Sequence, residues 1–227
     1  MSSTTLGIQM RNVVILAVGS FNPPTFGHLR MLEDAKDSLQ KAGINVLEGI
    51  MSPVSDGYGK KTLISSDHRF AMVVAATQDS DWIRADSWEC SKSEWTTTLN
   101  VLKHHEHDVK ERFGDDVGIY LLVGGDVVET FDKFNADGSP VWKREDVEML
   151  VSIGLVVQPR PGSDPEKTLE ILGLQGGDIN VHMIRNEIAS NAISSTRLRA
   201  AIKEHRSIKY TTPESVIKYI KENKLYE

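Results

Sequence analysis

Residues 13–30 read VVILAVGSFNPPTFGHLR, and their pattern indicates the class of fold. Its first part is an apolar run rich in β-branched residues, the pattern of a parallel strand that is covered on both faces. A turn of glycine and proline follows, and Thr25-Phe26-Gly27-His28 then opens a helix. Ligands of open α/β sheets bind beyond the carboxyl ends of such strands. The order of strand, turn and helix therefore predicts an anion site at the start of the helix, where backbone N–H groups are unpaired.

Five residues of this stretch suit such a site. Gly19 and Ser20 stand at the end of the strand, and Gly27 has no Cβ, so a phosphate-bearing ligand can come close to the backbone. Thr25 and His28 lie three residues apart at the helix start and can face the same anion. A strand-to-helix turn with an incidental histidine is the alternative, because the pattern TxGH is short.

Composition restricts the ligand and the compartment. The chain has 227 residues, 40% of them hydrophobic, which fits one α/β domain over 1–227 with a flexible start at 1–11. Its net charge is −6, so neither a nucleic acid nor an anionic membrane is expected as a partner, and a small anion fits better. Cys90 is the only cysteine, which excludes an internal disulfide and fits a reducing compartment. The first residues lack the apolar run of a signal peptide, so we expect an intracellular protein, in the cytoplasm or nucleus and not secreted.

Strand-like and helix-like runs alternate along the chain. This alternation is typical of βαβ units, and it predicts an α/β fold: a Rossmann-like open parallel sheet with helices on both faces and further helices at the C-terminus. Ser66 is expected to cap the helix that follows it. Strands are expected at 13–18, 44–51, 82–86, 119–123, 152–157 and 180–184, and helices at 28–41, 67–77, 95–112, 165–172, 195–205 and 212–222, with one more that ends near 134.

Residues 193–199 read ISSTRLR and form a second potential anion site. Hydroxyl groups stand at a helix start, where they can cap the helix or bind phosphate oxygens. Arg197 and Arg199 add planar, permanently charged donors that suit a polyphosphate. Taken alone, an ordinary capped helix with surface arginines is the simpler explanation. Together with the first motif, a phosphate site becomes the better one.

Several blocks of the sequence resemble one family. GSFNPPTFGH and ISSTRLR resemble the paired TxGH and ISSTxxR motifs of the nucleotidyltransferase superfamily. SPVSDGYGKKTLISSDHR, DSWE around Trp88, LLVGGDVVETF and VWKREDV are similar, in the same order, to blocks of the eukaryotic nicotinamide mononucleotide adenylyltransferases. The blocks extend from Gly19 to the end of the chain, and several blocks in one order are far more specific than either motif alone.

The resemblance implies an enzyme that joins nicotinamide mononucleotide, and also its nicotinic acid form, to the AMP part of ATP, giving NAD and pyrophosphate with Mg²⁺. The nucleophile is then the phosphate of the mononucleotide, which is ionised near neutral pH, so no side chain has to remove a proton. Catalysis needs alignment of that phosphate with the α-phosphorus and stabilisation of the leaving pyrophosphate. By the resemblance, His28, Arg197 and Arg199 are the catalytic residues, and Mg²⁺ is held by substrate phosphates rather than by side chains.

The resemblance also assigns binding residues. Trp88 and Trp142 would sandwich the cationic nicotinamide ring. Asp126 would bind ribose hydroxyls, and Lys60, or less strongly Arg69, would reach the mononucleotide phosphate. On the ATP side the resemblance implies Gly19, Ser20, Phe21, Thr25, His28, Arg160, Asn191, Ser195, Thr196, Arg197, Leu198 and Arg199. On the mononucleotide side it implies Gly19, Ser20, Lys60, Arg69, Trp88, Gly124, Asp126, Val141 and Trp142.

Two other patterns carry less weight. Residues 104–107 read HHEH, like a metal cluster, but consecutive residues point around a helix, so we expect a solvated helical face. Residues 59–62 read GKKT, which lacks the earlier glycine and the GK[ST] of a Walker motif.

Two other functions stay open. One is an adenylyltransferase for another phosphorylated acceptor such as phosphopantetheine, although that flexible arm has no ring to stack between Trp88 and Trp142. The other is a nucleotide-binding protein with a chaperone-like protective role, although the intact His28, Arg197 and Arg199 favour retained catalysis. The resemblance also makes a homo-oligomer an option, with no interface marked in the sequence.

Overall fold

The computed structural model describes residues 12–176, 179–185 and 193–227. The expected flexible start at 1–11 and the predicted ATP ligand Asn191 lie outside the described residues. The strands are β1 (Asn12–Gly19), β2 (Asn45–Pro53), β3 (Ile83–Ala85), β4 (Val117–Gly124), β5 (Leu155–Gln158) and β6 (Val181–Met183). The helices are α1 (Phe26–Lys41), α2 (Ser66–Thr77), α3 (Thr98–Phe113), α4 (Gly125–Val128), α5 (Arg144–Ile153), α6 (Pro165–Ile171), α7 (Ser195–Lys203) and α8 (Glu214–Glu222), with a 3₁₀ turn η1 (Asp56–Tyr58).

The strands form a parallel sheet with β1 near its centre. Within the described ranges their order is β3-β2-β1-β4-β5-β6. The chain builds outward from β1 to β3 and then crosses back to β4, so the order reverses between β1 and β4. Gly19 and Gly124 end these two strands, and this switch point is where open α/β sheets bind ligands. The predicted Rossmann-like fold class is confirmed.

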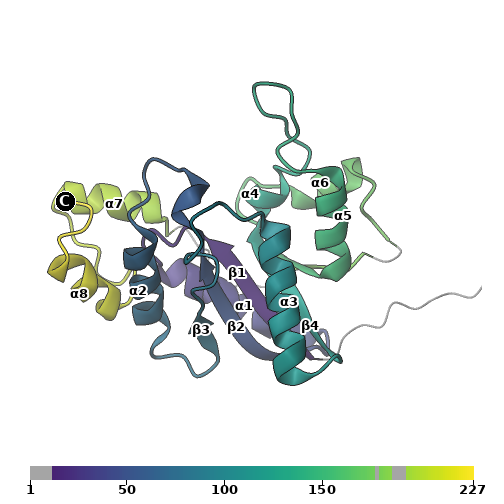
Figure 1. Ribbon diagram of the computed structural model, residues 1–227, viewed down its shortest axis with the longest axis horizontal. Coiled ribbons are helices and arrows are strands. Elements are labelled where there is room, and N and C mark those ends of the chain that lie inside the picture. The colour runs from purple at the N-terminus through teal and green to yellow at the C-terminus, as the bar shows by residue number, and fades with distance from the viewer. Residues whose placement is uncertain (1–11, 177–178, 186–192) are drawn as a thin grey trace, which may run out of the picture.

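Successive side chains of β1 point to opposite faces of the sheet, and both faces are buried. Val14 and Leu16 pack with α3 and α5 on one face. Val13 and Ile15 pack with α1 on the other. Figure 1 shows α3 in front of the sheet and α1 behind it. The continuous apolar run that predicted β1 is therefore explained by helices on both sides.

A third apolar cluster joins α2 to the C-terminal helices. Met72 of α2 packs with Leu198 of α7 and with Val216 and Ile217 of α8. In Figure 1 these three helices gather at one side of the sheet, so the second sequence motif, at the start of α7, lies on this side. No helix in the described ranges is both long enough and apolar enough to span a bilayer.

Several expectations about elements were wrong. Ser66 is the first residue of α2 and not its cap, and its hydroxyl donates to the Asp56 carboxylate at 3.1 Å. The helix after β4 ends at Val128 instead of near 134, because the chain turns so that Phe131 enters the core. The strand expected at 152–157 begins only at Leu155.

The helix α5, which precedes that strand, was missed. Val147, Leu150 and Val151 are its buried residues and follow helical spacing. Gly154 ends the helix with a φ of 156°, and a Cβ there would lie 2.6 Å from the Tyr120 ring. Glycine at this point allows the abrupt change from helix to strand.

Candidate active site

The helix α1 begins with a reciprocal cap made by Thr25 and His28. The Thr25 hydroxyl accepts the His28 amide at 3.4 Å, and the Thr25 amide donates to His28 Nδ1 at 3.0 Å. Because Nδ1 accepts a hydrogen there, the proton of the neutral imidazole is on Nε2. The cap therefore leaves Nε2 as a hydrogen-bond donor of fixed orientation.

The charge of His28, which the sequence left open, follows from its surroundings. Burial first, and then the nearby Arg160 guanidinium, lower the pKa of His28 to about 4. Phe21 meets the imidazole edge-on, with ring centroids 5.2 Å apart, from a backbone with a φ of 42° that non-glycine residues rarely adopt. At pH 7 His28 is therefore a neutral donor and not a cation.

The two sequence motifs meet directly. Ser195 Oγ donates to the carbonyl of Pro23 at 2.8 Å, and Arg199 Nη1 donates to the carbonyl of Asn22 at 2.8 Å. Thr212 Oγ1, further along, donates to the carbonyl of Pro24 at 2.8 Å. The turn before His28 is thus held by the segment that carries ISSTRLR, although the two lie at opposite ends of the sequence.

The other residues of the second motif divide into two groups. Thr196 and Arg197 are exposed in the first turn of α7, where helix N–H groups favour an anion. Leu198 points into the third apolar cluster, and its amide donates to the Ser194 carbonyl at 3.0 Å. Leu198 therefore directs neither its side chain nor its amide toward a ligand, while its neighbours can do so.

The end of β4 adds an acidic side chain at this edge of the sheet. A Cβ on Gly124 would collide with the Asp126 carboxylate, so glycine is required for Asp126 to fold back over the strand end. Arg160 Nη1 lies 3.4 Å from Asp126 Oδ2, and both side chains are more than half exposed. Because Arg160 also depresses the pKa of His28, its guanidinium lies near both the Asp126 carboxylate and the His28 imidazole.

Arg69 is fully buried, and protein oxygens occupy its donors. Its Nε donates to the Ile64 carbonyl at 3.0 Å, and Nη1 to the Ser20 carbonyl at 3.3 Å. Nη2 pairs with Asp56 at 3.0 Å. Arg69 thus links the turn, through the Ser20 carbonyl, to the loop at 54–65, through Ile64 and Asp56. Lys60 lies exposed in that loop.

Trp88 has both ring faces covered. His104 stacks on it with centroids 3.8 Å apart and an interplanar angle of 10°. That imidazole fills one face, so the Lys92 ammonium, 4.5 Å from the ring centroid, lies over the other. His105 is 1% exposed, so the expectation of a solvated face at 104–107 was wrong for this residue, because its side of α3 packs against the sheet.

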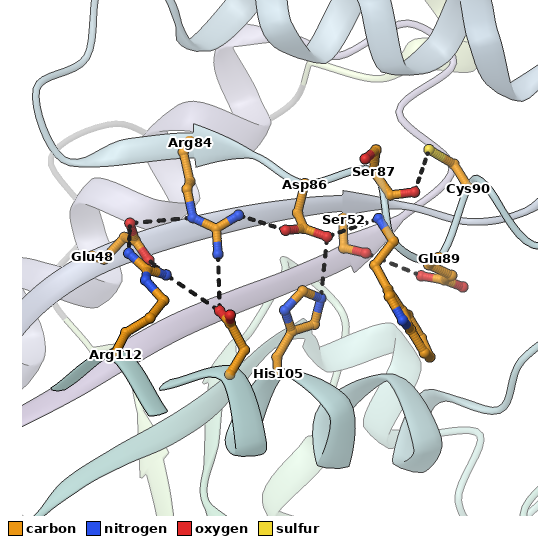
Figure 2. Close-up of polar contacts among 11 residues, drawn as sticks. Glu48, Ser52, Arg84, Asp86, Ser87, Glu89, Cys90, His105 and Arg112 are labelled. Carbon is orange, nitrogen blue, oxygen red and sulfur yellow. Dashed lines mark hydrogen bonds and ion pairs between the residues drawn. The ribbon is translucent and has the colours of Figure 1, made fainter. Parts of the chain in front are cut away.

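Figure 2 shows the polar contacts that fix the segment around Trp88. The Asp86 carboxylate accepts the Trp88 amide at 2.9 Å and pairs with Arg84 at 2.5 Å. The neighbouring Glu89 is 1% exposed, and burial raises its pKa to about 8, against the lowering effect of the Ser52 hydroxyl. Glu89 is therefore a neutral acid at pH 7, and contacts with Asp86 and Ser52 hold the segment in place.

Trp142 is half-buried and is held at its edge. Its Nε1 donates to Thr130 Oγ1 at 2.8 Å, and its ring meets Phe131 at an interplanar angle of 71°. Val141 beside it is 43% exposed. These contacts give the indole a fixed orientation, which ring stacking requires.

Sequence reasoning missed Trp95. It was expected inside a helix, but α3 begins only at Thr98, and Trp95 is 55% exposed. Its backbone packs on η1 so closely that a Cβ on Gly57 would lie 2.5 Å from the Trp95 amide. Ser55 Oγ also donates to the Glu94 carbonyl at 3.0 Å. Its exposure and its place beside the Lys60 loop are properties of the tertiary structure, so no local sequence signal identified it.

Around the turn the donors are neutral or cationic, namely His28, Arg197 and Arg199. Within the part of the chain that the structure describes, no group of three His, Cys, Asp or Glu is placed to hold a metal ion. This donor set fits phosphate oxygens. A parallel sheet with a capped histidine and helix-borne arginines at its switch point defines the class of α/β nucleotidyltransferases.

Comparison with known proteins agrees with this class. A family model described as cytidylyltransferase-like matches residues 16–201. Nicotinamide/nicotinic acid mononucleotide adenylyltransferase 2 of Caenorhabditis elegans is 49% identical over 221 residues, which cover 96% of this chain and 99% of that protein. The enzyme designated 1 of Bos taurus is 36% identical, covering 96% of this chain and 90% of its own length. The chain belongs to the nicotinamide/nicotinic acid mononucleotide adenylyltransferase family.

A solved structure supports the fold. Nicotinic acid mononucleotide adenylyltransferase of Plasmodium falciparum, complexed with NaAD, has a TM-score of 0.67 at 21% identity and covers 95% of this chain and 97% of that chain. At this level of identity the likeness shows the fold alone. The resemblance inferred from the sequence blocks is confirmed by the full-length relatives.

Proposed function

We propose that this chain condenses ATP with nicotinamide mononucleotide, and with nicotinic acid mononucleotide, by direct attack of the mononucleotide phosphate on the α-phosphorus. The observation that carries the proposal is the contact between the two motifs, in which Ser195 and Arg199 bond the turn before His28. The names of the relatives, which include both mononucleotides, support the choice of acceptor.

In this reaction a phosphate oxygen of the mononucleotide bonds to the α-phosphorus, and the bond to the β-phosphate oxygen breaks. The pair of electrons leaves with pyrophosphate. A neutral His28 donates from Nε2 to the α-phosphate, where negative charge gathers as the bonds exchange. Because its pKa is about 4, His28 is neutral at pH 7, and the remaining N–H of a neutral imidazole does not ionise near this pH, so His28 acts as a donor and not as an acid.

Arg197 and Arg199 bind the β- and γ-phosphates in the proposed complex. Two guanidinium groups at the start of a helix match the charge of the leaving pyrophosphate. Ser20, Thr196 and the backbone at Gly19 complete the phosphate cradle, and Thr25 acts through the cap by orienting His28. Mg²⁺ bound by the phosphate oxygens would offset part of their charge.

Recognition of the mononucleotide uses the loop at 54–65 and two indoles. Lys60 binds its phosphate, and Arg69 positions the loop from the interior. Trp142 stacks on one face of the pyridinium. Stacking by Trp88 requires Lys92 to leave the ring, whereas Trp95 already exposes its indole, so we favour Trp95 for the second face.

The assay that tests this proposal supplies ATP and Mg²⁺ with each acceptor in turn. We expect release of pyrophosphate and formation of the dinucleotide with both mononucleotides and none with phosphopantetheine, which has no ring to stack. Pyrophosphate release with phosphopantetheine alone would assign the chain to a different acceptor. Absence of turnover with every acceptor, together with protection of unfolded proteins from aggregation, would favour the non-enzymatic role.

Organisation and location complete the proposal. The family match over 16–201 supports one nucleotidyltransferase domain across 1–227. A single, buried cysteine supports an intracellular location, in cytoplasm or nucleus. A homo-oligomer stays a prediction, which light scattering of the purified protein would test.

A further inference from the structure

Asn22 is a junction between three segments of the chain. Its side chain is almost fully buried, with the residue 2% exposed. Its Nδ2 donates to the Thr62 carbonyl at 2.8 Å, and its own carbonyl accepts Arg199 Nη1 at 2.8 Å. Asn22 therefore links the turn at 20–25, in which it lies and which we call the phosphate turn, to the Lys60 loop and to α7.

The side-chain oxygen of Asn22 accepts a hydrogen bond from Tyr226. The Tyr226 hydroxyl donates to Asn22 Oδ1 at 2.7 Å, across 204 positions of sequence. Tyr226 follows α8 and is half-buried. Leu225 beside it is anchored in the third apolar cluster, so the approach of the hydroxyl is supported by packing.

We propose that Tyr226 is a positioning residue for the mononucleotide site, acting through Asn22. The identity of the substrate at this site rests on the proposed function. With the hydroxyl in place, both ends of the Asn22 amide are satisfied, and the amide N–H group stays aimed at the Thr62 carbonyl. That bond ties the Lys60 loop to the phosphate turn, and so sets where a mononucleotide phosphate is held.

The orientation of the amide depends on the hydroxyl for a physical reason. The Thr62 carbonyl can only accept, so it requires the N–H side of Asn22, and Oδ1 must then find a donor elsewhere. Without the Tyr226 hydroxyl, Oδ1 would be a buried acceptor with no replacement among the contacts described around it. An amide in that state gains by rotating toward water, which breaks the bond to Thr62.

The test removes a single oxygen atom. Tyr226→Phe keeps the ring and its packing but removes the hydroxyl. Tyr219→Phe is the matched control, because the Tyr219 hydroxyl bonds His68 Nδ1 at 3.0 Å, away from the turn. For both variants, KM and kcat are measured for ATP and for nicotinamide mononucleotide, and amide hydrogen exchange is followed at residues 60–63.

For Tyr226→Phe we expect KM for the mononucleotide to rise about tenfold, the scale of one unsatisfied buried acceptor, with kcat and KM for ATP nearly unchanged. Exchange at 60–63 should become faster, and Tyr219→Phe should match the unmodified protein. A role in general stability alone would lower the unfolding temperature and leave both KM values unchanged.

Three results would overturn the proposal: an unchanged KM for the mononucleotide, an equal rise for both substrates, or the same change in Tyr219→Phe. If the unmodified protein makes no dinucleotide, the proposed function has failed. Exchange at 60–63 then decides the positioning role by itself, because unchanged exchange in Tyr226→Phe would refute the tie between Asn22 and Thr62.

Discussion

The turn at 20–25 and the segment at 132–142 each carry predicted substrate contacts, but they are held in different ways. The turn accepts hydrogen bonds from side chains 172, 177, 188 and 204 positions further along the chain. In the other segment the bonds join near neighbours, such as the Val141 amide and the Lys133 carbonyl at 2.9 Å. Phe134 there is 70% exposed.

This difference indicates which part of the molecule has a fixed geometry before substrate binds. A turn held by distant segments cannot shift unless several elements move together, so the phosphate end keeps its geometry without substrate. A segment whose backbone bonds join near neighbours can move at lower cost, because fewer long-range bonds are lost, although Trp142 at its end packs against the core. We expect the phosphate end to set the rate and the ring end to set affinity.

The largest effect is expected at the phosphate end. His28→Ala should lower kcat by about a hundred- to a thousandfold, because it removes an oriented donor from the reacting phosphate. Dinucleotide formation at saturating substrates measures it, with circular dichroism to confirm the fold. His182→Ala serves as a control, since His182 bonds Ser38 elsewhere in the fold and should keep kcat. A normal kcat in His28→Ala would refute the assignment of the phosphate site.

The next effect concerns the ring end. Trp95→Ala and Trp142→Ala should each raise KM for the mononucleotide about tenfold, which corresponds to the loss of one cation–π contact. Their effect on kcat should be small. Trp88→Ala should chiefly lower the unfolding temperature, because this ring is packed between His104 and Lys92. If Trp88→Ala instead gives the larger rise in KM, Trp88 is the stacking residue and Trp95 is not.

A third effect is on stability against acid. Burial lowers the pKa of His28 from 6.5 to about 4, so between these values the unfolded chain binds a proton that the folded chain does not. The contribution is complete above pH 6.5 and is lost as pH falls toward 4. The unfolding temperature of the unmodified protein should thus fall on acidification from pH 7, and His28→Gln should flatten the curve.

His105 provides a check on this prediction. Burial also lowers its pKa to about 4, so His105→Gln should flatten the same part of the curve. The two variants differ in one respect, since only His28→Gln should lose turnover. An identical pH curve for His28→Gln and the unmodified protein would mean that His28 titrates normally.

The smallest effect is expected at the tip of the segment 132–142. Asp137 accepts bonds only from Ser139 among the described contacts, two residues away. Asp137→Ala should change kcat and both KM values by less than about twofold, as is usual for an exposed site. A large loss of turnover would show that the tip closes on the substrate, and the contrast between the two regions would then fail.

Much of the fold could be predicted from local patterns. The unbroken apolar run of β1 predicted a strand covered on both faces, and Gly19 and Ser20 at its end predicted the ligand edge. α5 was missed because its three buried residues follow a loop with strong turn signals. Trp95 was missed because a charged, helix-like run appeared to include it, although Thr97 caps the helix further on.

The candidate site was predictable in its residue types and less so in its roles. TxGH and ISSTRLR were predicted to form one site, and the structure brings them together through the bonds of Ser195 and Arg199 to the turn before His28. Arg69 shows the limit. An arginine in the DHR block suggested a phosphate ligand, yet its guanidinium lies at 0% exposure among the Ile64, Ser20 and Asp56 oxygens.

The sequence alone determined the class of fold, the family and the two phosphate motifs, because these depend on spacing between neighbours and on blocks in a recognisable order. Only the tertiary structure decided that the imidazole of His28 is neutral with its proton on Nε2, that Arg69 is internal, and that Tyr226 reaches Asn22. Burial and contacts across some 200 positions set these properties, and no local pattern records which distant atoms will surround a side chain.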